Sequence, residues 1–241
     1  MGPSIEKQSQ VPTTIEVPDD VEATLIKGDR PEALEYEPFT PASYYFTADY
    51  RADITVEGNY YFFIYSDKGE GRYGIAVGYV ETFTLIEWLM IPIDVINIHQ
   101  WEGQSIFLIL APLALTLLLG LSLMFWKLKL KPTSSVAVFL GVLAGLLYIG
   151  SGLMIITQML IALIGATLTS SSVLTLVFSV LPALFGFLIL RKIVKHNIPW
   201  KKRDRLIFVV LGILGYILWA GILLGPSLII LVSVLPMTTF S

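Results

Sequence analysis

The residues able to carry out chemistry are few in this chain, and they complete no familiar catalytic motif. There is no cysteine, which excludes disulfides, thiolate metal sites and cysteine nucleophiles. The histidines are His99 and His196. No His-Glu-x-x-His, Walker-type glycine loop or Gly-x-Ser-x-Gly sequence is present. Conventional hydrolase or nucleotide chemistry is therefore disfavoured, and we expect no cofactor.

Acidic side chains provide other candidate chemistry, because they form three clusters in the N-terminal half. Calcium takes several oxygen ligands, and such clusters can supply them. The complete EF-hand spacing is absent, however, and 18 of the 19 acidic residues precede residue 105. We therefore interpret the clusters as a solvated acidic surface and assign no metal ligand. The clusters are Asp19, Asp20 and Glu22; Glu32, Glu35 and Glu37; and Asp67 and Glu70.

Long uncharged runs dominate the C-terminal half of the chain. The apolar fraction is 55% and the mean hydropathy is +0.73. About 20 apolar residues suffice for a helix to cross a hydrocarbon core of about 30 Å. Residues 105–241 are therefore predicted to form an α-helical transmembrane bundle of about four spans, with a turn at Thr167–Ser172. Gly225-Pro226 predicts a kink, after which the chain either extends the fourth helix or turns back as a short fifth element. The spans are expected near 105–126, 135–163, 173–192 and 206–228.

Basic residues next to the predicted spans indicate the orientation. Lysine and arginine are in excess on the cytoplasmic side of membrane proteins. The net charge is −12 over residues 1–104 and +9 over residues 105–241. This pattern predicts a cell-membrane protein with an extracytoplasmic N-terminal domain, cytoplasmic basic loops and, with four spans, both termini outside. The basic residues follow the first span (Lys127, Lys129, Lys131) and fill the loop before the fourth (Arg191, Lys192, Lys195, Lys201, Lys202, Arg203, Arg205).

Two consequences follow from this orientation. A short basic loop between spans faces anionic lipid, which disfavours nucleic acid as its partner. His99 and His196 are placed on opposite sides of the membrane and are not expected to share a site.

An exported domain normally follows a signal peptide, and Met1–Ser4 does not open an apolar segment. We therefore expect a leader in the encoded precursor.

The N-terminal part of the chain carries strand patterns. Residues 1–20 are polar and contain three prolines, which is typical of a flexible tail. Asp53–Glu57 alternates polar and apolar residues, and aromatic Tyr60–Tyr65 is separated by a Gly- and Asp-containing turn from Arg72–Tyr79. Alternation bounded by such turns is typical of half-buried antiparallel strands. Residues 21–80 are accordingly predicted to form a small all-β sandwich.

Part of this region resembles a known family. Gly58-Asn59-Tyr60-Tyr61-Phe62-Phe63-Ile64-Tyr65 and Gly71-Arg72-Tyr73-Gly74-Ile75-Ala76-Val77-Gly78 are similar to the closing strand pair of pre-peptidase C-terminal (PPC-like) jelly-roll domains. Those domains are small extracytoplasmic β-sandwiches attached to secreted or membrane proteins. The resemblance covers residues 52–80, implies the same fold and location, and transfers no functional residue.

Residues 81–104 separate the predicted sandwich from the first span. Polar residues recur at near-helical spacing, and Trp88 and Trp101 flank the stretch, while Pro92 is expected to kink or restart any helix. An amphipathic segment with tryptophan at both ends is typical of a membrane-interface anchor. The alternative interpretation is that His99–Gln104 forms a site.

Residues 105–126, 135–163, 173–190 and 206–228 contain no Asp, Glu, Lys, Arg or His, which disfavours proton-coupled transport. Their most polar group comprises Tyr148, Ser151, Thr157 and Gln158, expected to bond helix to helix. Glycines four residues apart allow close helix packing. They indicate either packing within the chain or an interface with a partner membrane subunit, including a second copy. These glycines are Gly141, Gly145, Gly221 and Gly225.

The sequence favours a non-catalytic multi-pass membrane protein that presents its outer domain as a binding module, or as an accessory subunit of an envelope complex. One alternative is a transporter or channel component with a path near Gln158. Another is a metal-dependent membrane enzyme that uses outer-face carboxylates. The absence of cysteine and of an Asn-x-Ser/Thr sequon favours a prokaryotic source.

Overall fold

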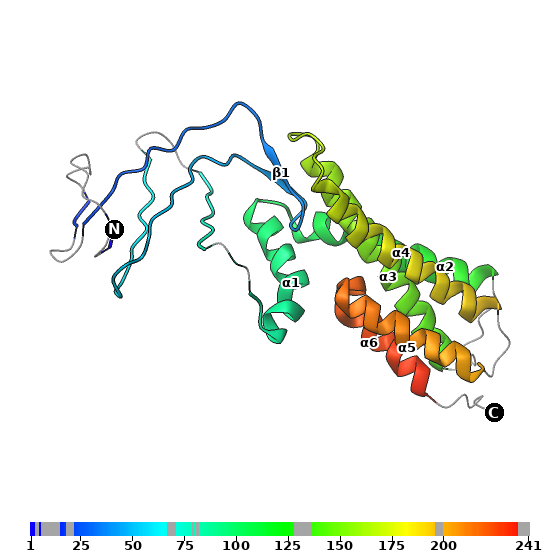
Figure 1. The fold of residues 1–241 in the computed structure, drawn as a ribbon. Coiled ribbons are helices and arrows are strands. Elements are labelled where there is room, and N and C mark those ends of the chain that lie inside the picture. Colours follow the sequence, from blue (N-terminus) through cyan, green and yellow to red (C-terminus); the bar gives the residue numbers. More distant parts are fainter. Residues whose placement is uncertain are drawn as a thin grey trace. The chain divides into compact units, whose positions relative to one another are not determined.

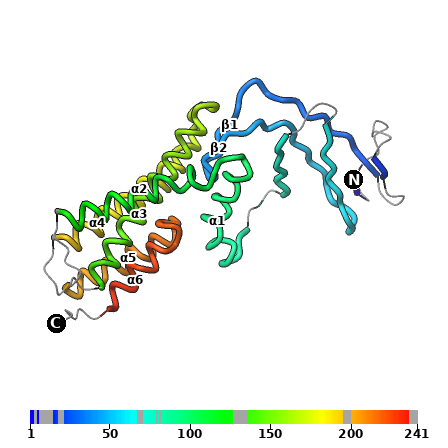
Figure 2. Tube along the Cα trace, turned by 180° about the vertical axis from the view of Figure 1, so that it is seen from behind, coloured from blue at the N-terminus to red at the C-terminus, as the bar shows by residue number. Residues whose placement is uncertain are grey.

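The computed structural model describes residues 1–2, 5, 15–17, 22–66, 71–78, 80, 82–127, 136–195 and 200–235. Contacts divide the chain into two compact units. The N-terminal unit comprises Met1–Glu35 and Tyr44–Val77, and the helical unit comprises Tyr36–Ser43 and Gly78–Ser241. Figure 1 and Figure 2 show the course of the chain through both.

The predicted N-terminal β-sandwich is wrong. The described residues contain a single two-stranded sheet, formed by β1 (Glu35–Glu37) and β2 (Ala42–Tyr44). In the N-terminal unit, isolated interactions join extended segments without a ladder, for example the bridge between Gly2 and Glu22. Alternation makes a segment suited to half burial, but a strand also needs a neighbour that takes its backbone hydrogen bonds. The predicted turn at residues 67–70 lies outside the described residues.

Helix α1 (Leu85–Trp101) begins the main run of the helical unit. The Thr84 side chain accepts from the Glu87 backbone N–H, and the Glu87 carboxylate accepts from the Thr84 N–H, which completes a capping box. These bonds hold the pKa of Glu87 below its ordinary value. The helix continues through Pro92. Its more buried positions include Trp88, Val95 and His99, at the spacing of one helical face.

Helices α2 (Ile106–Lys127), α3 (Val136–Ala162) and α4 (Ser172–Lys195) coincide with the first three predicted spans. Each is long and apolar enough to cross a membrane. They lie side by side in both views (Figure 1, Figure 2). Within the apolar windows, 61% of the α3 residues are buried inside the chain, compared with 11% in α2. Helix α3 is therefore central, while α2 turns most of its surface outward.

The fourth predicted span is broken. Helix α5 (Lys202–Ile217) ends before a 3₁₀ turn, η1 (Ala220–Leu223), and α6 (Leu224–Val234) follows at an angle of 115° to α5. Pro226 lies in the first turn of α6, where proline is tolerated. The break therefore precedes Gly225-Pro226, where the kink was predicted.

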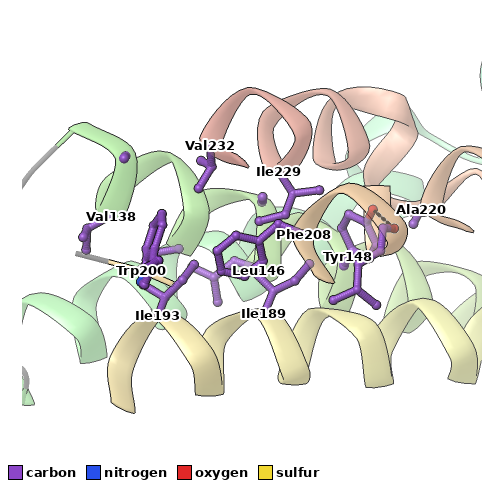
Figure 3. Close-up of a cluster of buried hydrophobic side chains, with 14 residues drawn as sticks. Val138, Leu146, Tyr148, Ile189, Ile193, Trp200, Phe208, Ala220, Ile229 and Val232 are labelled. Atoms are coloured by element: carbon purple, nitrogen blue, oxygen red, sulfur yellow. Dashed lines mark hydrogen bonds between the residues drawn. The ribbon is translucent and has the colours of Figure 1, made fainter. Parts of the chain in front are cut away.

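A core of buried side chains joins α3 to α4, α5 and α6 (Figure 3). Tyr148, near the middle of α3, is fully buried, and its hydroxyl donates to the Leu211 carbonyl of α5 at 2.9 Å. Ile189 of α4, Phe208 of α5 and Ile229 of α6 are also fully buried in this cluster. The core therefore fixes α5 and α6 against the central helix.

Candidate functional site

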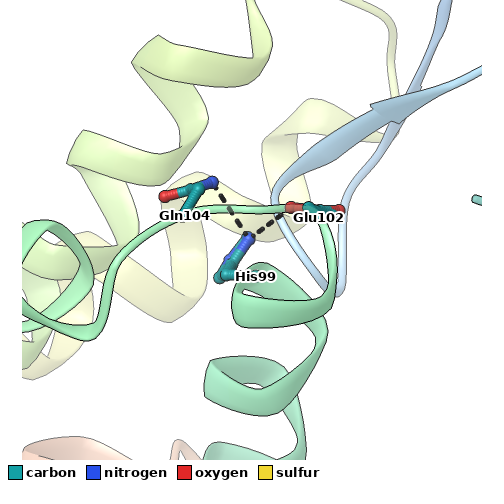
Figure 4. Close-up of polar contacts among 3 residues, drawn as sticks. All are labelled: His99, Glu102 and Gln104. Carbon is teal, nitrogen blue, oxygen red and sulfur yellow. Dashed lines mark hydrogen bonds and ion pairs between the residues drawn. The ribbon is translucent and has the colours of Figure 1, made fainter.

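His99 belongs to the segment His99–Gln104 that was predicted as a possible site. It lies at the C-terminal end of α1 and is 1% exposed. Its Nδ1 is 2.9 Å from the Glu102 carboxylate, and the Gln104 side-chain amide nitrogen is 3.5 Å from the same atom (Figure 4). A carboxylate only accepts hydrogen bonds, so the His99 Nδ1–H donates to Glu102. No hydrogen-bond partner is present for Nε2 within the described part of the chain.

A small cavity brings His99 together with Gln158 of α3, which the sequence singled out separately. Gln158 is 3% exposed, and neither polar atom of its side chain has a hydrogen-bond partner among the described residues. The cavity has a volume of about 20 Å³. Its remaining lining is apolar and comes from four elements: Pro41, Val95, Ile96, Ile109, Met154 and Ile155.

The polar side chains that line this cavity are His99 and Gln158, and both can form hydrogen bonds there. A volume of this size holds about one water molecule. Across the described residues there is no group of three or more His, Cys, Asp or Glu side chains that could hold a metal ion. The acidic residues Asp19, Asp20, Asp67 and Glu70 lie outside the described residues. A transport path near Gln158 stays a prediction.

The tip of the β1–β2 hairpin belongs to the helical unit and contacts α4. The Thr175 hydroxyl donates to the Pro38 carbonyl at 2.8 Å, which leaves it to accept from the Tyr36 hydroxyl, also at 2.8 Å. Tyr36 is 5% exposed and Thr175 is 1% exposed. Burial raises the pKa of the Tyr36 phenol, so it remains a donor at neutral pH. This contact was not predicted, because residues 36–43 read as part of the sandwich.

An aromatic stack links α1 to the break between α5 and α6. The ring centroid of Trp219 lies 4.5 Å from that of Trp88 and 5.1 Å from that of Phe178. The Trp219 indole N–H also donates to the Trp88 carbonyl at 2.9 Å. Trp88, predicted as an interface anchor, thus contacts the helical bundle, whereas Trp101 is 43% exposed. Trp219 carried no signal in the sequence.

The residues of the predicted basic loop divide into two groups. Lys201, Lys202 and Arg203 are exposed. Arg205 donates to the Ser233 carbonyl at 3.0 Å. Lys192 forms a 2.8 Å ion pair with Asp204, which is 7% exposed. The pair ties the end of α4 to the start of α5. His196 and residues 128–131 lie outside the described residues.

The four predicted packing glycines all face side chains of the same chain. A Cβ at Gly141 would meet Ile193, one at Gly145 would meet Leu190, and one at Gly225 would meet Tyr148. Gly221 has a positive φ of 59° and lies against Leu147. Packing within the chain thus accounts for these positions, and a partner subunit at them stays a prediction.

The N-terminal unit exposes large apolar side chains. Over residues 60–65, exposure is 49% for Tyr61, 63% for Phe62 and 60% for Phe63. These neighbours would point to opposite faces of a strand, so both faces are uncovered. Eight further apolar or aromatic side chains with exposures of 43% or more are Phe46, Tyr50, Ile54, Val56, Ile64, Tyr73, Ile75 and Val77.

Comparison with protein-family models, curated proteins and solved structures found no match to this chain. The resemblance to PPC-like domains is not tested by these comparisons and stays a prediction, whereas the sandwich it implied is absent from the described residues. The candidate spans of a membrane protein rest on α2, α3 and α4, with a fourth only if α5 and α6 count as one bent span.

Proposed function

We propose that this chain is a non-catalytic membrane protein whose N-terminal unit binds β-strands of a partner protein, as an accessory subunit of a membrane complex. The observation that carries the proposal is the exposure of five neighbouring apolar side chains, Tyr61 to Tyr65, which are 40–63% exposed. Large exposed apolar patches mark interaction surfaces or aggregation hazards. A segment rich in β-forming residues is suited to join the edge of a partner's sheet, where backbone hydrogen bonds supply affinity.

The size of the exposed surface supports a stable partner. Full burial of one large apolar side chain contributes about 1.5–3 kcal/mol. Because the five side chains of residues 61–65 are already about half buried, covering their remaining surface would contribute roughly 4–8 kcal/mol. Association and side-chain ordering cost about 4–15 kcal/mol, so most of the run must be covered for binding to persist. Near Ile54 and near Ile75, further exposed apolar side chains recur at every second residue, the period of a strand.

The proposed orientation places this unit outside the cell. The N-terminal unit precedes α2, and the exposed Lys201, Lys202 and Arg203 lie between α4 and α5. One crossing by α2 and two more by α3 and α4 separate the N-terminal unit from these basic residues. By the excess of Lys and Arg on the cytoplasmic side, the basic segment is cytoplasmic and the N-terminal unit extracytoplasmic.

The test is gentle detergent extraction from the native membrane, followed by mass spectrometry of co-purifying proteins. Phe62→Asp is compared with Phe39→Asp, whose side chain is similarly exposed at 58% but lies in the helical unit. We expect a stoichiometric partner, recovery at least tenfold lower with Phe62→Asp, and unchanged recovery with Phe39→Asp. Backbone amides of residues 60–65 are expected to gain hydrogen-exchange protection in the complex.

A clean monomer or homo-oligomer from the native membrane would overturn the proposal. Equal partner recovery with both aspartate variants would also overturn it, because binding would then not depend on the exposed run. A complex that leaves residues 60–65 unprotected would exclude strand pairing.

A further inference from the structure

We propose that α5 and α6 form a re-entrant hairpin, which enters the membrane from the side of the basic segment and returns to it without crossing. Each of the two helices is shorter than a membrane span. At about 1.5 Å per residue, the 16 residues of α5 and the 11 of α6 reach roughly 24 and 16 Å. Neither length crosses a hydrocarbon core of about 30 Å.

Contacts between the two helices show that α6 returns toward the start of α5. Arg205, in the first turn of α5, donates to the carbonyl of Ser233, in the last turn of α6, at 3.0 Å. Near the turn, the hydroxyls of Tyr216 and Ser227 are 2.7 Å apart. A single bent span would carry the start of α5 and the end of α6 to opposite faces of the membrane. Here these two ends meet.

The depth of the turn in the membrane follows from the position along the central helix α3 that it contacts. The Gly221 backbone N–H donates to the Ser151 hydroxyl at 2.8 Å. Ser151 lies about 22 Å along an α3 helix of roughly 40 Å, so the turn is near mid-depth. Tyr148 contacts both Gly215 of α5 and Gly225 of α6. Beyond it, α6 returns along α3 until Val232 lies against Gly141, toward the end where α3 begins.

Ala220 and Gly221 of the turn are buried in protein, and Trp219, Ile222 and Leu223 are half-buried, as non-helical backbone within a membrane requires protein cover. Trp219, Ile222 and Leu223 adopt positive φ values of 49°, 52° and 64°, which is costly for residues with a side chain. The stack of Trp219 between Trp88 and Phe178 opposes this strain. The hydrogen bond from Gly221 to Ser151 satisfies a backbone donor that lipid could not.

The consequence is an odd number of crossings. Helices α2, α3 and α4 cross three times, so the end of α6 lies on the same side as Lys202. This differs from the prediction of four crossings with both termini outside. The inference does not depend on which side is cytoplasmic or on a partner, so its failure is distinguishable from failure of the proposed function.

The natural absence of cysteine makes a direct test possible. Single variants Leu235→Cys, Lys202→Cys and Ser170→Cys mark the end of α6, the start of α5 and the α3–α4 turn. Each is treated with a membrane-impermeant maleimide in intact cells and in inverted vesicles, and all are labelled in detergent as a control. We expect Leu235→Cys to label from the same side as Lys202→Cys and from the opposite side to Ser170→Cys.

Labelling of Leu235→Cys from the side of Ser170→Cys would overturn the hairpin and establish a fourth crossing. A protease-sensitive tag added after Ser241 provides the second measurement, should a thiol at position 235 prove unreactive in detergent. The hairpin requires cleavage from the Lys202 side, and cleavage from the Ser170 side would refute it.

Discussion

At the scale of single residues, His99 Nε2 and both polar atoms of the Gln158 side chain lack hydrogen-bond partners among the described residues. The cavity that these two residues share is otherwise lined by apolar side chains. A buried donor or acceptor without a partner costs about 1–3 kcal/mol. One water molecule fits the volume and resolves the problem, because it can donate to His99 Nε2 and accept from the Gln158 amide nitrogen. Such a bridge would couple α1 to α3.

Replacement of Gln158 by Met tests this bridge through the sign of the stability change. Met keeps the length of the side chain but removes both polar atoms. If water bridges the residues, Gln158→Met leaves His99 Nε2 unsatisfied, and we expect a loss of about 1 kcal/mol, or roughly 2–4 °C in Tm. Thermal unfolding in detergent measures the shift, with the exposed Gln100→Met as control. A raised Tm would show that the cavity is dry, because removal of an unsatisfied amide stabilises.

At the scale of elements, Tyr148 determines how α5 and α6 pack on α3. Its ring occupies the space left by Gly215 and Gly225, and its hydroxyl reaches Leu211. Close approach of three helices at one aromatic side chain explains why glycine is required at these two positions. A methyl group at either would overlap the ring.

Gly215→Ala is therefore expected to destabilise the helical unit by about 1–3 kcal/mol, the usual cost of overpacking. The nearest atom to the added Cβ is the Tyr148 hydroxyl oxygen, so Tyr148→Phe should recover part of the loss in the double variant. Thermal unfolding of both single variants and the double variant measures the coupling. Gly74→Ala adds a Cβ to open space and serves as control. Additive single effects would show that the two residues do not compete for space.

The helices and their break differ in how well the sequence predicts them. Uncharged runs long enough to cross lipid place α2, α3 and α4 correctly, because exclusion of charge is a strong and local signal. The break after Ile217 carries no such signal. The break depends on Trp219 stacking between residues distant in sequence. The kink was predicted at Gly225-Pro226, a few residues C-terminal to the observed break. His99 and Gln158 were both identified as polar candidates, but their shared cavity follows only from helix packing.

At the scale of the whole molecule, the N-terminal unit shows the limit of local patterns. Residues 60–65 have strand composition, yet they form no sheet in the described chain. A period of two reports which residues would share a face, and pairing depends on a second segment that periodicity does not identify. The sequence of residues 60–65 therefore predicts strand composition but not the segment with which a strand would pair.

The link between the units is also testable, because the β1–β2 hairpin tip belongs to the helical unit while its strands continue into the N-terminal unit. Thr175→Val keeps the side-chain shape but removes the hydroxyl that holds Tyr36 and Pro38. Two lost hydrogen bonds at about 1 kcal/mol each predict a roughly 30-fold larger open population of the tip. Hydrogen exchange of residues 36–44, followed by mass spectrometry in detergent, measures it.

Thr157→Val is the matched control, since that hydroxyl bonds only within α3 to the Leu153 carbonyl. We expect faster exchange of the hairpin with Thr175→Val alone and unchanged exchange in α4. Equal exchange in the two variants would mean that apolar packing, and not the buried hydroxyl pair, seats the tip. Faster exchange with Thr175→Val would instead identify this hydroxyl pair as the contact that holds the hairpin tip against α4.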